Sequence, residues 1–120
     1  MKTLFFATFT LLMFGISNAQ ISDIQQKGSF LYVYGENNKR ISSLQLSSSD
    51  EYLGMASSFY IVKKGSFLYV YDYDSNRVSS MQLSSTDRFR SASGNSFNIQ
   101  KGSFVYTYDK NCKQISRRQL

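Results

Sequence analysis

The sequence predicts an all-β protein built from tandem antiparallel β-meander repeats of about 37 residues. The first observation is the segment Lys-Gly-Ser-Phe-Leu-Tyr-Val-Tyr at residues 27–34, which recurs unchanged at 64–71 and with two substitutions at 101–108. The second is the composition, with nine Tyr, ten Phe and no Pro, which favours pleated sheet over helix. Within each copy the aromatic and aliphatic side chains alternate with the period of two that a strand requires.

The first nineteen residues have the three-part pattern of a secretory signal peptide. Lys2 gives a positive start, residues 4–14 form an apolar run, and Ser17 and Ala19 are the small residues before a cleavage site. An apolar run of about eleven residues is much shorter than the roughly twenty that span a bilayer, so we expect no transmembrane segment in the mature chain. Cleavage after Ala19 and the lack of any Asn-x-Ser/Thr sequon favour a secreted or periplasmic bacterial protein.

The mature chain, residues 20–120, is then a single repeat domain with units at about 21–57, 58–94 and a truncated 95–120. In the second unit we expect a weak strand at 59–62, a tight turn at Lys64-Gly65, and the aromatic strand at 67–71. A turn rich in Asp and Asn at 72–76 and a third strand at 77–83 follow. Residues 87–93, and 50–56 before them, are expected to form a closing fourth strand of their units.

The segment Gly-Ser-Phe-Leu-Tyr-Val-Tyr-Asp at 65–72, with a polar turn and Arg-Val-Ser-Ser at 77–80, resembles the blade repeat of PQQ-type β-propellers. The resemblance implies propeller-like blades of four short antiparallel strands. The chain departs from that family because it has no Trp, lacks the usual Gly in the turn, and has fewer than three full units. We therefore expect either closure by a homo-oligomer or an open twisted sheet whose edges pair with another chain, and a monomeric curved sheet or compact barrel is the competing alternative.

The composition excludes most catalytic chemistry. Without His, no His-dependent triad or imidazole metal site can form, and one Cys cannot build a disulfide framework or a thiolate zinc cluster. We expect no cofactor, no metal and no enzymatic activity. A hydrolase that uses only carboxylates, such as Asp72 or Asp87, is the least favoured alternative.

The candidate binding residues are aromatic and basic side chains that recur once per unit. A Tyr at the end of each aromatic strand is expected either to pack in the core or to present a flat face to a sugar ring or a peptide. The recurring cations are expected either to be solvated turn and edge charges or to face an anionic partner, such as an acidic glycan or a lipid headgroup. The aromatic residues are Tyr34, Tyr71 and Tyr108, and the basic residues are Lys27, Lys64, Lys101, Arg40, Arg77 and Lys113.

These patterns predict an exported, non-enzymatic binding or structural module that acts through an aromatic and basic sheet surface. The alternative in the same compartment is an inhibitor or immunity-type protein that blocks a partner protein. Nucleic acid is disfavoured, because the chain is exported and its formal net charge is only +6.

Native mass spectrometry of residues 20–120 is expected to show an oligomer, because an open sheet leaves edges that pair with another chain. Cys112, the single Cys, is a candidate for an intermolecular disulfide, which would separate when a reductant is added. A monomer as the only species at micromolar concentration would contradict a ring closed by several chains.

Overall fold

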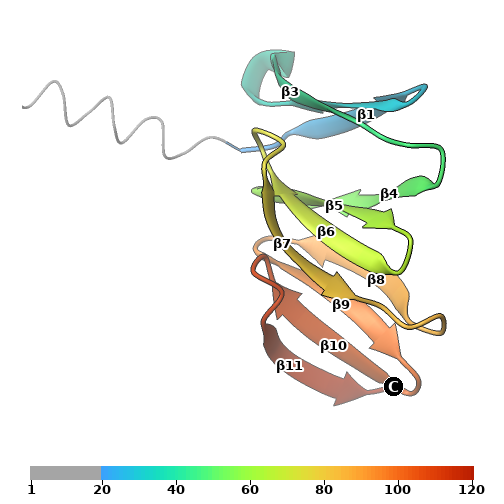
Figure 1. Ribbon diagram of the computed structural model, residues 1–120. Coiled ribbons are helices and arrows are strands. Elements are labelled where there is room, and N and C mark those ends of the chain that lie inside the picture. Colours follow the sequence, from blue (N-terminus) through green and yellow to red (C-terminus); the bar gives the residue numbers. More distant parts are fainter. Residues whose placement is uncertain (1–19) are drawn as a thin grey trace, which may run out of the picture.

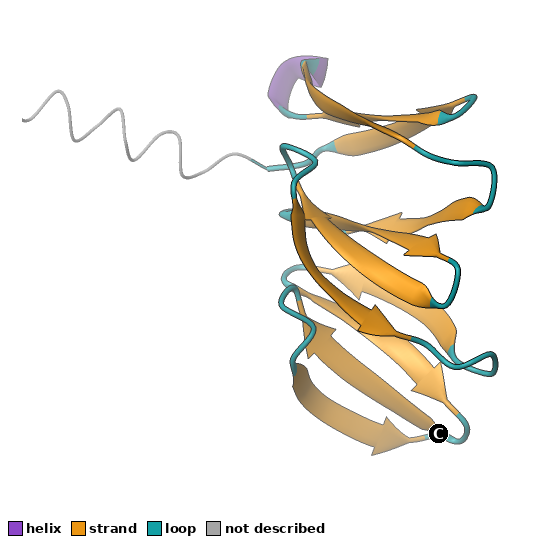
Figure 2. Ribbon diagram, in the orientation of Figure 1, coloured by secondary structure: helices purple, strands orange, loops and turns teal. Residues whose placement is uncertain are grey.

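The computed structural model describes residues 20–120, and the predicted signal peptide lies outside them. The described chain forms three antiparallel sheets that lie one above another (Figure 1). Apart from a short 3-10 turn, Glu36–Asn38, the regular structure is strand (Figure 2). None of the three sheets of this range closes on itself, so the predicted all-β fold with open twisted sheets is confirmed. Over this part of the chain, no helix is long and apolar enough to cross a membrane.

Each sheet is a meander in which strands that follow one another in the sequence are neighbours. The first sheet has the order β1-β2-β3, the second β4-β5-β6-β7, and the third β11-β10-β9-β8. The bounds are β1 Asp23–Lys27, β2 Phe30–Tyr34, β3 Arg40–Gln45, β4 Asp50–Met55, β5 Phe59–Lys64, β6 Phe67–Asp72, β7 Arg77–Gln82, β8 Arg88–Ser93, β9 Ser96–Lys101, β10 Phe104–Asp109 and β11 Gln114–Gln119.

The position of one strand differs from the expectation. Strand β4 pairs with β5 and so opens the second sheet instead of closing the first. A tight turn explains this, because the Ser47 N–H donates to Asp50 Oδ2 at 2.9 Å and the Asp50 N–H to the Ser47 carbonyl at 3.1 Å. The turn directs the chain out of the first sheet. The third sheet therefore has all four strands, and the first sheet is the one with three.

The turn between the first two predicted strands forms as expected. Lys64 pairs with Phe67 across the two-residue connection of β5 and β6, and Gly65 has a φ of +63°. A hairpin this tight needs a positive φ at its first central residue, which glycine adopts without a steric penalty. The same residue type occupies the same place between β1 and β2 and between β9 and β10.

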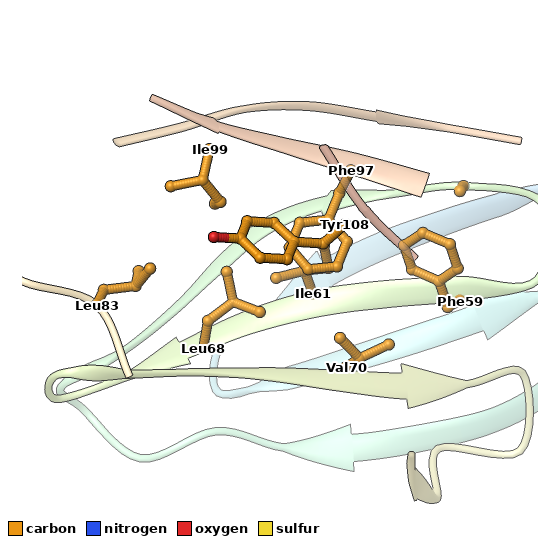
Figure 3. Packing of buried hydrophobic residues seen from close by; sticks show 9 residues of the cluster. Phe59, Ile61, Leu68, Val70, Leu83, Phe97, Ile99 and Tyr108 are labelled. Carbon is orange, nitrogen blue, oxygen red and sulfur yellow. The ribbon is translucent and has the colours of Figure 1, made fainter. Parts of the chain in front are cut away.

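Two apolar layers hold the three sheets together. Between the first and second sheets, Leu31 and Val33 pack against Tyr60, Val62 and Tyr71. The larger layer lies between the second and third sheets (Figure 3). Its buried members are Ala56, Phe59, Ile61, Leu68, Val70, Leu83, Phe97, Ile99 and Tyr108. The second sheet is thus buried on both faces, as a strand with apolar residues at successive positions requires.

At several positions, the outer faces of the two end sheets carry polar residues where the second sheet has apolar ones. Tyr60 and Val62 of the second sheet face the first sheet, and the residues 37 positions earlier, Asp23 and Gln25, are exposed. In the third sheet, five positions that correspond to interface residues of the second sheet are polar, although Leu68 corresponds to the apolar Val105. The pairs are Leu53 and Arg90, Phe59 and Ser96, Ile61 and Asn98, Val70 and Thr107, and Met81 and Arg118.

These substitutions make the end sheets caps, because a terminal repeat needs a polar outer face. On the third sheet the polar groups also bond to one another, since Thr107 Oγ1 donates to Asn98 Oδ1 at 2.6 Å and Asn98 Nδ2 to Ser91 Oγ at 3.1 Å. A further sheet stacked on this face would bury that network. The homo-oligomer stays a prediction, and these faces argue against a ring closed by copies stacked face to face.

Polar side chains connect neighbouring sheets at two equivalent turns, the turn before β7 and the turn before β11. Ser42 Oγ donates to the Tyr73 carbonyl at 2.7 Å and lies 2.9 Å from Ser75 Oγ. The Tyr60 hydroxyl also donates to Ser75 Oγ, at 2.7 Å. One repeat later, Ser79 Oγ donates to the Lys110 carbonyl at 2.6 Å. Each turn is therefore attached to the sheet before it as well as to its own.

Replacement of Phe97 by Ala is expected to lower the free energy of unfolding by about 3–5 kcal/mol. Phe97 is fully buried, with its ring centroid 6.2 Å from that of Phe59 and 5.6 Å from that of Tyr108. Phe67→Ala is the matched control, because Phe67 is 40% exposed and its loss should cost about 1 kcal/mol or less. Urea unfolding measures both values, and equal losses would contradict the assigned core.

Tyr60 gives the fold a dependence on high pH. Burial is the largest cause that raises the pKa of Tyr60 to about 12, against an ordinary value of 10.0. The unfolded chain therefore loses this proton first, so the contribution of Tyr60 to stability should be constant below about pH 10 and fall between about pH 10 and 12. Tyr60→Phe should show a shallower fall in urea midpoint over that interval than the wild type or the matched control Tyr32→Phe. An unchanged slope would contradict a buried phenol.

Candidate binding surface

The outer face of the first sheet carries an exposed row of aromatic side chains on β2. Because side chains alternate along a strand, Leu31 and Val33 enter the layer below, and Phe30, Tyr32 and Tyr34 point to the other face. We call Phe30, Tyr32 and Tyr34 the ladder face. Phe30 is 37% exposed, and the two Tyr rings are half-buried. Phe30 and Tyr32 are stacked, with centroids 6.1 Å apart and planes 13° apart.

Polar side chains of the neighbouring strands flank the ladder face. Arg40 Cζ of β3 lies 4.5 Å from the centroid of the Tyr32 ring, a cation–π distance. The Tyr34 hydroxyl donates to Gln25 Oε1 of β1 at 3.4 Å. Lys27 is exposed beside Phe30, its partner in the β1–β2 pairing. The surface is therefore a flat aromatic row bordered by two cations and hydrogen-bonding groups.

The corresponding rows of the other two sheets are partly covered. Phe67 is stacked on Tyr69 at 6.3 Å, but Tyr71 is only 7% exposed because the first sheet covers it. Tyr108 is only 8% exposed because the second sheet covers it. Of the two alternatives expected for these rings, Tyr71 and Tyr108 therefore take the first and pack in the core. Only Tyr34 keeps an accessible ring, since no sheet of the described chain lies over it.

The lysines at the three hairpins have different partners. Lys64 Nζ lies 3.5 Å from Asp50 Oδ2, and Lys101 Nζ lies 3.5 Å from Asp87 Oδ2. The side chains of these carboxylates are only 5% and 7% exposed. Within residues 20–120, no carboxylate lies within 4 Å of Lys27. The three lysines occupy the same position of the repeat, but only Lys64 and Lys101 are paired with a carboxylate, and Lys27 has no such partner within the described chain.

The hydrogen bonds at these turns keep both carboxylates ionised. The backbone N–H of Ser47 is the largest cause that lowers the pKa of Asp50, and Lys64 adds to it. Burial acts to raise the pKa of Asp87, but the hydrogen bonds from Ser84 together with Lys101 outweigh it and lower the pKa. The two aspartates therefore form structural ion pairs, and neither is set up as a proton donor.

The cations that were expected at the start of the third strands lie apart from one another. Arg77 Cζ is 5.0 Å from the centroid of the Tyr69 ring, and it repeats the position of Arg40 over Tyr32. Lys113 instead lies exposed in a turn, where its backbone N–H donates to Asp109 Oδ1 at 3.0 Å. The structure thus brings Lys27 and Arg40 to the ladder face and leaves Lys113 at the far end of the stack.

The excess of positive charge belongs almost entirely to the third sheet. Residues 84–120 contain seven basic and two acidic residues, whereas residues 20–83 contain six of each. The two acidic residues are already engaged, Asp87 with Lys101 and Asp109 with its own turn. The net charge of the whole chain had obscured this division, which a count per repeat would have found.

Cys112 lies in the last turn at the place that Ser75 occupies one repeat earlier. Its thiol is half-buried and 3.2 Å from Ser79 Oγ, and both Cys112 and Ser75 have a φ close to +62°. Burial is the main cause that raises the pKa of the Cys112 thiol. A protonated, half-buried thiol reacts slowly, and the intermolecular disulfide stays a prediction.

Neither a metal centre nor a catalytic pair emerges from residues 20–120. No group of three or more Asp, Glu or Cys in this range could hold an ion. Asp72 Oδ1 accepts hydrogen bonds from the backbone N–H groups of Asp74 and Asn76, at 2.9 and 3.0 Å, so it builds a turn. A cavity of about 440 Å³ lies between β4 and β8 and is lined mainly by polar groups such as Glu51, Lys63 and Arg90.

Neither a model of a known protein family nor any curated protein matches this sequence.

Proposed function

We propose that this chain is an exported, non-enzymatic binding module whose ligand lies on the ladder face. The observation that carries the proposal is the unequal exposure of one repeated motif. The aromatic row is present in all three sheets, but its last ring is covered in the second and third and accessible in the first. A row of stacked aromatic rings with polar borders suits a flat amphipathic ligand.

The chemistry of the borders favours an anionic glycan. Sugar rings have apolar faces that lie on Phe30 and Tyr32, and their hydroxyl groups match Gln25 and the Tyr34 hydroxyl. Lys27 and Arg40 then stand at the two sides of the row, where they attract carboxylate or sulfate groups. The charged third sheet adds long-range attraction for the same kind of polymer.

The three sheets are further proposed to be blade units of the kind found in β-propellers. The four-stranded second and third sheets and the 37-residue period support this relation, as does the contact between their first strands, β4 and β8. The polar network of Ser91, Asn98 and Thr107 on the outer face of the third sheet favours a stack of three blades over a segment of a closed ring.

Phe30→Ala and Tyr34→Ala are expected to weaken binding to an acidic polysaccharide, such as polygalacturonate or dextran sulfate, by roughly three- to tenfold each. Phe104→Ala is the matched control, because Phe104 is the counterpart of Phe30 in the third sheet and should leave affinity nearly unchanged. Isothermal titration with the exported protein measures these affinities, and Arg40→Gln should reduce their dependence on salt. Equal losses in Phe30→Ala and Phe104→Ala would contradict the assigned face, and binding to a single protein but no glycan would favour the inhibitor.

A further inference from the structure

We propose that the edge of β1 that faces away from β2 binds one extended segment of another polypeptide, which completes the first sheet as its fourth strand. This inference does not rest on glycan binding, because it concerns the backbone edge of the sheet, although Lys27 borders both that edge and the ladder face. Addition of a strand to an open edge is a common mode of peptide recognition.

The repeat shows that a strand belongs at this edge. Strand β4 occupies it in the second sheet and β8 in the third, and each pairs from end to end with the next strand apart from one bulged residue. No strand within residues 20–120 occupies it in the first sheet. The positions 37 residues before β4 are 13–18, which the predicted cleavage after Ala19 removes. The exported chain would therefore carry the gap.

The backbone of β1 is oriented to accept such a strand. Lys27 and Phe30 close a two-residue hairpin, so the hydrogen-bonded pairs between β1 and β2 alternate from that point. The alternation places the backbone N–H and C=O groups of Ile24 and Gln26 on the opposite edge. In the second sheet the corresponding edge is engaged, as the Ala56 N–H donates to the Phe59 carbonyl at 2.8 Å.

Lys27 specifies an acidic residue in the incoming segment. At the same position in the other repeats, Lys64 and Lys101 are each paired at 3.5 Å with an aspartate that begins or precedes the first strand of the sheet. Lys27 is the one member of the set without such a partner in the described chain. An Asp or Glu at the start of the added strand would supply the missing charge.

The Tyr52 ring limits the size of the residue that stands four positions after the acidic residue of the incoming segment. A Cβ atom on Gly54 of β4 would lie 3.2 Å from ring carbons of Phe89 on β8, so the first strands of neighbouring sheets pass closely. Tyr52 is the counterpart of Phe89 one repeat earlier, and it is half-buried against the layer below the first sheet. The segment therefore needs Gly opposite the Tyr52 ring, four residues after its acidic residue, as Gly54 follows Asp50.

The gap has room for one strand only. Ile24 of β1 and Tyr52 of β4 both pack against the layer that contains Tyr60 of β5, so β4 lies opposite the unoccupied place beside β1. Neighbouring strands lie about 4.8 Å apart and stacked sheets about 10 Å apart. A second copy aligned along its own β1 would bring its second sheet into the space of this β4. A single extended segment avoids that overlap.

A synthetic peptide with the sequence of residues 49–57 tests the proposal, because it contains β4, the natural occupant of this place one repeat later. The protein is the exported chain that begins at Gln20, and fluorescence anisotropy of the labelled peptide measures binding. We expect saturable binding of one peptide per chain. The peptide with Gly54→Phe should bind at least about tenfold more weakly, and the peptide with Asp50→Asn about two- to fivefold more weakly.

Variants of the protein locate the site. Lys27→Met should lower the affinity about two- to fivefold and abolish the difference between the unmodified peptide and the peptide with Asp50→Asn. Lys101→Met, which changes the matched lysine two sheets away, should leave both affinities unchanged. Hydrogen exchange at the Ile24 and Gln26 amides should slow when the peptide binds, whereas an acidic glycan should leave it unchanged.

Three results would overturn the proposal. They are no saturable binding at about millimolar peptide, equal effects of Lys27→Met and Lys101→Met, and a dimeric native mass with slow hydrogen exchange at the Ile24 and Gln26 amides in the absence of peptide.

Discussion

Burial of one sheet against the next is the interaction on which the rest of this structure depends. A three- or four-stranded meander cannot bury an apolar face by itself, so each repeat is stable only with a neighbour. The second sheet shows this most clearly, because Tyr60 and Val62 face one neighbour while Phe59 and Ile61 face the other. The polar connections at Ser42 and Ser79 then fix how each sheet is turned relative to the next.

The same dependence decides which repeated residues reach the surface. Tyr34, Tyr71 and Tyr108 have one origin in the repeat, but two of them lie under a neighbouring sheet. Likewise, Lys64 and Lys101 each form an ion pair with an aspartate at or just before the neighbouring strand, whereas Lys27 forms none within the described chain. Position in the stack, and not residue type, separates structural residues from candidate binding residues. Both proposed sites lie on the first sheet for this reason.

Much of the fold could be predicted because local signals agree in every copy. The period-two alternation predicts the aromatic strands, and the recurring Lys-Gly predicts the hairpins. Which sheet β4 joins was not predictable in this way, because the choice depends on the Ser47–Asp50 turn and on contact with β8. The site was predicted only in its residue types, since the exposure of Tyr34 and the burial of Tyr71 follow from packing between sheets far apart in sequence.

The polar residues on the outer faces of the end sheets also affect how such a chain can change in length. Only the middle repeat of the described chain packs against another sheet on each side, so it alone can be duplicated without burying the polar residues of an end sheet. An insertion of a second middle repeat would meet a complementary surface on each side, and the N- and C-terminal sheets would stay at the ends. The first and third sheets therefore cap the stack, and gene duplication of the middle repeat can lengthen it while both caps stay the same.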